Sequence, residues 1–177
     1  MNRDTNPRID TKSSLLRLKH RSNAASWATG LLSSAAGVVF ASPNIVQDRP
    51  DVLSKFVGAA FFVGAIAVSA ANSRATTAGC NRVMQTTTSN QPDKPFHRKQ
   101  PNVARLASLT SLALGAELVT MSPNLLEQNP DFLPTTIIGM TAFVAVGIGG
   151  ILINRTNEHS DIKLVEMRLA GNDASTS

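Results

Sequence analysis

Hydrophobic and charged residues are sharply separated along this chain. The charged residues gather in three blocks, at residues 1–21, 73–102 and 155–177. The rest of the chain contains four segments with little charge, at residues 23–42, 51–72, 103–122 and 132–153. As a helix, each segment is about 30 Å long, which is the thickness of the hydrocarbon core of a bilayer.

The second and fourth segments show no polar face. Residues 56–71 and 137–153 are almost entirely apolar, whereas a helix on the surface of a soluble protein carries polar residues along one side. We therefore predict that these two segments span a membrane.

The first and third segments are diluted by polar residues. The first contains Ser26, Thr29, Ser33 and Ser34, and the third contains Arg105, Ser108, Thr110, Ser111 and Glu117. A soluble four-helix bundle is the alternative fold, but the two strongly apolar segments argue against it. A weaker helix can also insert as a hairpin with its stronger neighbour. The predicted fold class is an all-α integral membrane protein with four transmembrane helices.

A short motif occurs twice in the chain, eighty positions apart. Ser42-Pro43-Asn44, followed by Pro50-Asp51, returns as Ser122-Pro123-Asn124, followed by Pro130-Asp131. Proline cannot continue a helix interior and suits the first turn of a helix, so the motif predicts a tight turn between two spans. We therefore expect two tandem helical hairpins that enter the membrane in the same direction, related as a parallel repeat.

The basic residues predict an orientation. Lys and Arg prefer the cytoplasmic side of a membrane, and nearly all of them lie in the three charged blocks, while the two turns contain only Arg49. Both termini and the middle block are therefore expected in the cytoplasm. Residues 24–40 could instead belong to a cleaved signal peptide, but the repeat places an equivalent segment in mid-chain, where no signal peptide belongs. The net charge of +5 is mainly a topology signal, and no clustered basic face indicates nucleic acid as a partner.

These boundaries divide the chain into five parts. We expect a basic cytoplasmic segment at 1–22, a first hairpin at 23–74, a flexible linker at 75–102, a second hairpin at 103–155 and a cytoplasmic amphipathic tail at 156–177. The linker assignment rests on a composition rich in Thr, Ser, Asn and Gln. In the tail, Ile162, Val165 and Leu169 recur at helical spacing, with Ser160 as a candidate cap.

Two charged residues inside the expected spans are the candidate functional site. Lys55 and Glu117 lie about 6–8 Å inside the outer boundary, at about 1.5 Å per residue. Charges inside a membrane are costly and usually pair, so Lys55 and Glu117 are a candidate intramembrane ion pair that would clamp the hairpins together. Two alternatives stay open: Lys55 reaches the interface by itself, or Glu117 handles protons or cations. Arg105 is expected to be an interfacial anchor.

Catalysis has little support in the sequence. His20, His97 and His159 stand singly in the charged blocks, and Cys80 is the only cysteine. We expect no enzyme, no cofactor and no metal. The predicted role is structural or partner-recruiting, with the bilayer and a protein at the linker or tail as partners; the alternative is a small transporter or pore that uses Glu117. Small residues four positions apart, such as Thr141, Ala145 and Gly149, favour close helix packing or a homo-oligomer.

Overall fold

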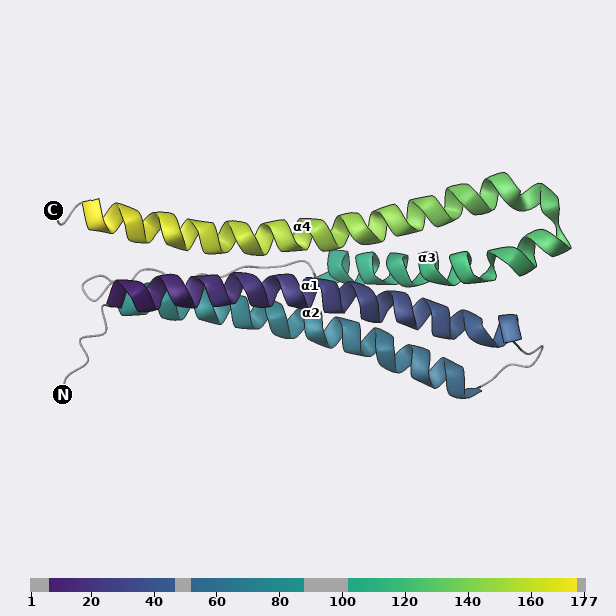
Figure 1. The fold of residues 1–177 in the computed structure, drawn as a ribbon, viewed down its shortest axis with the longest axis horizontal. Coiled ribbons are helices and arrows are strands. Elements are labelled where there is room, and N and C mark those ends of the chain that lie inside the picture. The colour runs from purple at the N-terminus through teal and green to yellow at the C-terminus, as the bar shows by residue number, and fades with distance from the viewer. Residues whose placement is uncertain (1–6, 47–51, 88–101, 175–177) are drawn as a thin grey trace.

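The computed structural model describes residues 7–46, 52–87 and 102–174, and this part of the chain is almost entirely helical. The elements are α1 (Pro7–Val46), α2 (Val52–Thr87), α3 (Asn102–Gln128), a short 3₁₀ helix η1 (Pro130–Phe132) and α4 (Leu133–Ala174). Helix α1 runs antiparallel to α2, and α3 runs antiparallel to α4 (Figure 1). The predicted all-α class is confirmed, and all four α-helices are long and apolar enough to cross a membrane.

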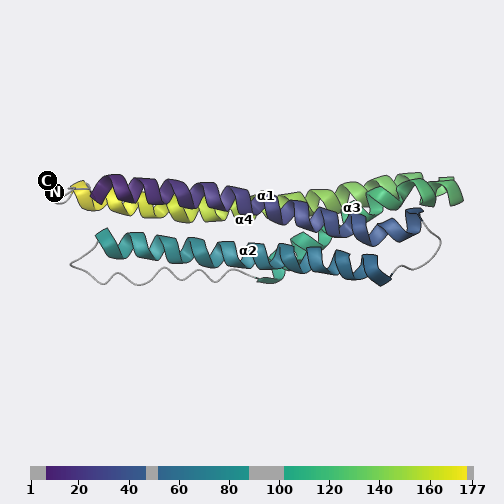
Figure 2. The same cartoon turned by 60° about the horizontal axis from the view of Figure 1, so that its bottom comes forward.

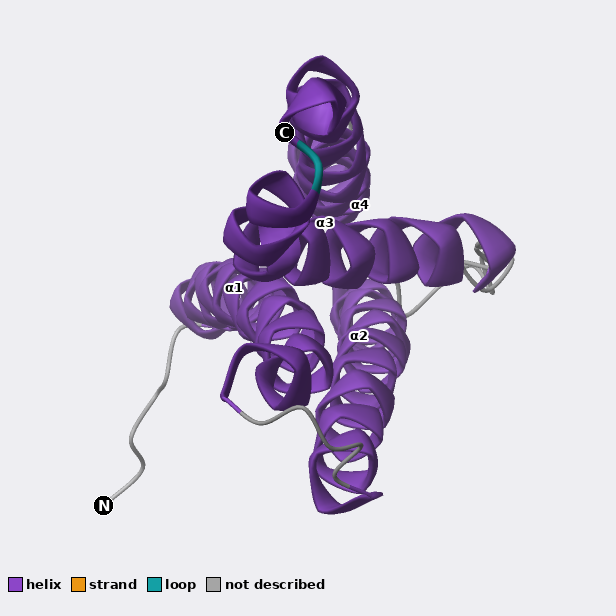
Figure 3. Cartoon of the chain, turned by 90° about the vertical axis from the view of Figure 1, so that its right-hand side faces the viewer, coloured by secondary structure: helices purple, strands orange, loops and turns teal. Residues whose placement is uncertain are grey.

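The helices pack as two hairpins joined at their centre. Helix α1 packs mainly on α2, α3 packs mainly on α4, and α1 and α3 form the main contact between the hairpins. Figures 2 and 3 show the same arrangement from the side and from one end.

Three of the helices are much longer than the fourth. Helices α1, α2 and α4 contain 40, 36 and 42 residues, whereas α3 contains 27. At about 1.5 Å per residue, the three long helices measure about 54–63 Å and α3 about 40 Å. Helix α3 therefore begins part of the way along the bundle (Figure 1). Beyond that point residues 7–21 of α1, 75–87 of α2 and 159–174 of α4 continue without it, and we call this part the three-helix end.

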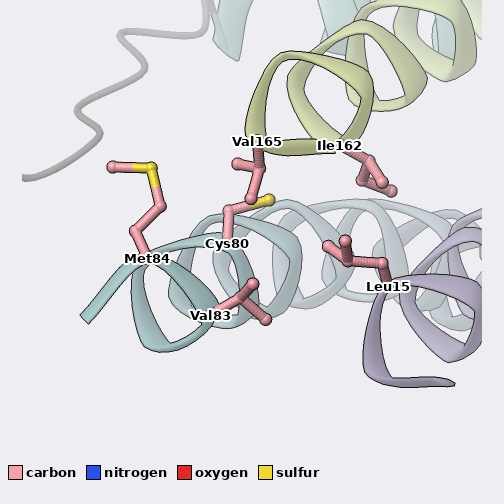
Figure 4. Packing of buried hydrophobic residues seen from close by; sticks show 6 residues of the cluster. All are labelled: Leu15, Cys80, Val83, Met84, Ile162 and Val165. Carbon is pink, nitrogen blue, oxygen red and sulfur yellow. The ribbon is translucent and has the colours of Figure 1, made fainter. Parts of the chain in front are cut away.

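The three-helix end has its own hydrophobic core. The core comprises Leu15 from α1, Cys80, Val83 and Met84 from α2, and Ile162 and Val165 from α4 (Figure 4). Leu18 and Leu169 pack against it. These side chains recur at helical spacing, so each helix presents one apolar side to the other two.

This core corrects two sequence predictions. The linker expected from residue 75 is wrong for residues 75–87, because they continue α2 as a helix. Burial of Cys80, Val83 and Met84 outweighs the weak helix propensity of the surrounding Thr and Asn residues. The remainder of the predicted linker lies largely outside the described residues. The predicted tail helix exists as a continuation of α4, so Ser160 does not cap it; the Ser160 hydroxyl donates to the carbonyl of Thr156 at 2.9 Å.

The Ser-Pro-Asn motifs do not end their helices. Helix α1 continues past Pro43 to Val46, and α3 continues past Pro123 to Gln128. Proline lacks the N–H that would reach the carbonyl of Val119, but the Ser122 hydroxyl donates to this carbonyl at 2.9 Å. In this second copy the motif thus contains its own compensation for the proline. The second turn follows at Asn129, and Asp131 lies in the first turn of η1; the first turn lies outside the described residues.

The part of the bundle that contains α3, which we call the apolar part, exposes large apolar residues and buries mainly alanines and hydroxyl-bearing residues, together with Leu109 and Leu112. Its buried residues include Ser26, Thr29, Ser33, Ser69, Ser108 and Ser111. Its exposed residues include Trp27, Leu31, Phe56, Val63, Ile138 and Val146. A water-soluble bundle buries its large apolar residues, as the three-helix end does in its core, so the two parts of the bundle differ in what they expose.

The contact between the hairpins depends on close approach of α1 and α3. A Cβ atom added at Gly37 of α1 would lie 2.0 Å from the carbonyl oxygen of Ala113 in α3. One turn along the same interface, the Ser33 hydroxyl donates to the carbonyl of Leu109 at 2.5 Å. By contrast, Gly149 of α4 has no atom within 4 Å of an added Cβ, and Ala145 is exposed. Not all of the small residues therefore serve packing within one chain.

We expect Gly37→Ala to destabilise the protein by about 1–3 kcal/mol, because the methyl group forces two helix backbones apart. The matched variant Gly149→Ala should be neutral or stabilising by up to about 1 kcal/mol, since alanine favours a helix and nothing opposes it. Thermal unfolding of both variants in detergent, followed by circular dichroism, measures the difference. Equal stability of the two variants would contradict the close α1–α3 contact.

Candidate functional site

A buried cluster of polar residues joins all four α-helices near the start of α3. It comprises Ser22 of α1, Ser69 and Asn72 of α2, Arg105 of α3, and Asn154 and Glu158 of α4. We call these six residues the polar cluster. It lies between the apolar part of the bundle and the three-helix end, where the long helices leave α3 behind.

Glu158 is the centre of the polar cluster. It is only 1 % exposed. Its Oε2 accepts hydrogen bonds from the Ser22 hydroxyl and from Asn72 Nδ2, the latter at 2.7 Å. Its Oε1 accepts a longer hydrogen bond, 3.4 Å, from Asn154 Nδ2 and lies 3.8 Å from Arg105 Nη2. A buried carboxylate is tolerated only when it is paired and hydrogen-bonded, and here three other helices supply those partners.

Arg105 provides the opposite charge and a second link between the hairpins. Its Nε and Nη2 donate to Asn154 Oδ1 at 3.2 and 2.9 Å, and its Nη1 donates to the backbone carbonyl of Ser69 at 3.2 Å. The side chain is 14 % exposed. Arg105 therefore does more than anchor α3 at an interface, because its planar guanidinium connects α3 to both α4 and α2.

A small cavity adjoins the polar cluster. Arg105, Asn72 and Asn154 line it together with hydroxyl groups from α1 and α3, and its volume is about 20 Å³. That is enough space for about one water molecule. The Oδ1 of Asn72 is buried and has no protein partner. The cavity is too small to admit an organic substrate.

One pattern in the sequence of α4 indicates the polar cluster. Asn154, Glu158, Ile162 and Val165 recur at intervals of four, four and three residues, which places them on one side of α4. Glu158 therefore shares the buried side with two core residues. We read it as part of a solvated charged block because its neighbours in sequence are polar.

Lys55 and Glu117 are placed differently from the polar cluster. Lys55 is exposed near the start of α2, and Glu117 is half-buried on α3. Helices α2 and α3 have few contacts with each other, because α1 packs against both of them. In the described part of the chain no ion pair joins these two side chains. The clamp between them stays a prediction, for which exchanging the two charges is the test.

The isolated histidines and the cysteine that the structure describes have no reactive partners. His20 is exposed on α1, and His97 lies outside the described residues. Burial, followed by the charges of Lys19 and Arg155, lowers the pKa of His159, which favours its neutral form. Burial and, to a smaller degree, the Asp161 carboxylate raise the pKa of Cys80 to about 11, so its thiol is protonated and poorly reactive. Among the described residues, no group of His, Cys, Asp or Glu could hold a metal ion.

Removing either charge of the polar cluster should destabilise the protein by about 3–5 kcal/mol, because the partner is left buried and unpaired. The double variant Arg105→Met with Glu158→Gln should cost less than the sum of the two single changes, with a coupling of about 1–3 kcal/mol. Thermal unfolding of the four proteins in detergent measures this cycle. Glu166→Gln, at an exposed position of the same helix, is the control and should be neutral. Strict additivity would show that the pair does not hold the hairpins together.

Comparison with protein-family models, with curated proteins and with solved structures finds no match. No relative therefore supplies a function for the polar cluster or for the three-helix end, and both have to be interpreted from their own chemistry.

Proposed function

We propose that this chain is a multi-pass membrane protein with a structural role, in which four embedded helices anchor the three-helix end outside the bilayer. This proposal rests on the different distribution of apolar side chains in the two parts of the bundle. The apolar part exposes large apolar residues such as Phe56 and Ile138 and buries serines, which suits a lipid environment. The three-helix end buries an apolar core and exposes charges such as Lys12 and Lys163, which suits water.

The rigid connection between the two parts supports a role in recruitment or positioning. Helices α1, α2 and α4 run without interruption from the apolar part into the three-helix end. Continuous helices hold the two parts at a fixed distance and angle, as a scaffold for a partner requires. The polar cluster at the junction adds contacts from all four helices.

We infer that the two hairpins are copies of one unit, inserted in parallel. Asn72, Thr76, Cys80 and Val83 in α2 have the same spacing as Asn154, Glu158, Ile162 and Val165 in α4. All of these positions except Asn154 are buried. The correspondence supports a repeat that extends from the apolar segments into the three-helix end.

The alternative function, a small transporter or pore using Glu117, has less support. The buried hydroxyls of α1 occur at Ser22, Ser26, Thr29 and Ser33 and then give way to Ala36 and Gly37. At Gly37 the backbones of α1 and α3 are in close contact. The polar interior therefore reaches only about half of the apolar length, and a path for ions would need polar groups along the rest.

The scaffold proposal predicts a partner that depends on the folded three-helix end. A protein that co-purifies in gentle detergent should be lost with Val165→Asp, because an unpaired carboxylate in this core breaks the packing of three helices. It should be retained with Glu127→Gln, which changes the opposite end. Liposomes containing the chain should show no proton or ion flux above empty liposomes. Flux that falls with Glu117→Gln would replace the scaffold by the transporter.

The orientation follows from charge and has its own test. Described basic residues are abundant at the three-helix end, whereas the turn between α3 and α4 lies beside Glu127 and Asp131. We therefore expect both termini in the cytoplasm. In a Cys80→Ala background, an impermeant maleimide added to intact cells should label Glu127→Cys and leave Ser160→Cys unlabelled until the cells are opened. The reverse pattern would invert the topology.

A further inference from the structure

Three arginines surround the polar cluster on the outside of the bundle. Arg21 is adjacent to Ser22, Arg74 is two residues beyond Asn72, and Arg155 is adjacent to Asn154. Ser22 and Asn72 both bond directly to Glu158, and Asn154 lies one helical turn before it on α4. The three arginines therefore lie at about the same level along the bundle. We call Arg21, Arg74 and Arg155 the arginine ring.

The side chains of the arginine ring point away from the interior. Arg21 and Arg74 are exposed and Arg155 is partly exposed, while their neighbours Ser22 and Asn72 are buried. The nearby carboxylate of Glu158 is 1 % exposed and already engaged in the polar cluster. Glu158 therefore does not neutralise the arginine ring, which remains a positively charged surface.

The level of the arginine ring coincides with the end of the apolar surface. The only tryptophan of the chain, Trp27, is 69 % exposed. It lies six residues beyond Arg21 on α1, or about 9 Å further toward the apolar part at about 1.5 Å per residue. Exposed tryptophans of membrane proteins are enriched at the boundary between lipid and water. If the bundle is embedded, the arginine ring lies at the depth of the lipid headgroups.

We propose that the arginine ring binds the headgroups of anionic phospholipids, so that a negatively charged lipid is preferred at this boundary. The inference rests on the proposed membrane insertion. Guanidinium groups form charge-assisted, often bidentate hydrogen bonds with phosphate oxygens. A basic residue at a membrane surface strengthens association with anionic lipid by a factor of about five, so three of them give a preference of up to about a hundredfold.

The position of the ring favours lipid over an acidic protein as its partner. Exposed Lys19 lies beside the ring, two residues from Arg21, whereas exposed Lys12, Lys163 and Arg168 lie about 12–20 Å further from the boundary at about 1.5 Å per residue. That distance exceeds the thickness of a headgroup layer, which is about 5–8 Å on each side of the core. These three residues have the same total charge as the ring, and they provide a matched control set.

Trp27 allows the preference to be measured without an added probe. The protein is reconstituted into vesicles of phosphatidylcholine and phosphatidylglycerol, with bromine on the acyl chains of one lipid or of the other. Brominated chains quench the fluorescence of a neighbouring tryptophan, so the ratio of the two quenching values reports which lipid lies beside Trp27. For the wild type we expect phosphatidylglycerol to exceed its share of the bilayer at least severalfold.

The variants decide whether the ring causes this preference. Arg21→Gln, Arg74→Gln and Arg155→Gln together should remove most of it, with only the contribution of the neighbouring Lys19 left, while Lys12→Gln, Lys163→Gln and Arg168→Gln together should retain it. If the first set does not fold, Arg21→Gln alone should lower the preference by a factor of about five. Equal loss with both sets, or no loss with the ring set, would overturn the inference.

Two further outcomes separate this inference from the proposed function. Equal quenching by both brominated lipids would show an embedded protein without lipid preference; it would overturn the inference and leave the ring for an acidic protein partner. Absence of quenching by either lipid would show that Trp27 does not face a bilayer, and it would overturn the proposed membrane insertion itself.

Discussion

The arrangement of the four helices depends on one buried carboxylate. Glu158 must have a partner on each side because an uncompensated charge in a protein interior costs several kcal/mol. Its partners come from α1, α2, α3 and its own helix. The positions of all four helices are therefore fixed at one level. The apolar segments alone would permit many rotations and depths, since lipid and apolar side chains are nearly equivalent surroundings.

This constraint also separates two modes of helix packing along one bundle. On one side of the polar cluster, close contacts such as Gly37 with Ala113 allow helices to associate without a large apolar interior. On the other side, Leu15, Cys80 and Val165 form a core of the kind found in soluble proteins. Both modes of packing use the same continuous helices. The polar cluster lies where one mode changes into the other, which is where polar side chains cost least.

The sequence predicts the helices well and their ends poorly. Apolar runs of about twenty residues identified the four helices, because hydrophobic length is a strong and local property. Residues 75–87 looked like a linker because their helix depends on burying Cys80 and Val83 against two distant helices. Pro123 looked like a helix end because the compensating bond from Ser122 to Val119 depends on a side-chain rotamer. Glu158 was missed because its burial, too, depends on distant partners.

The two copies of the proposed repeat differ at the positions that supply the charges of the polar cluster. Thr76 and Ala25 stand in the first hairpin where Glu158 and Arg105 stand in the second. Two carboxylates at equivalent buried positions would repel each other and could not both stay ionised in a dry interior. Placing both charges in the second hairpin lets it neutralise itself, while the first contributes neutral donors and acceptors from Ser22, Asn72 and Ser69. Two identical hairpins could not form this site. The differences between the copies therefore provide the polar contacts that join the two hairpins.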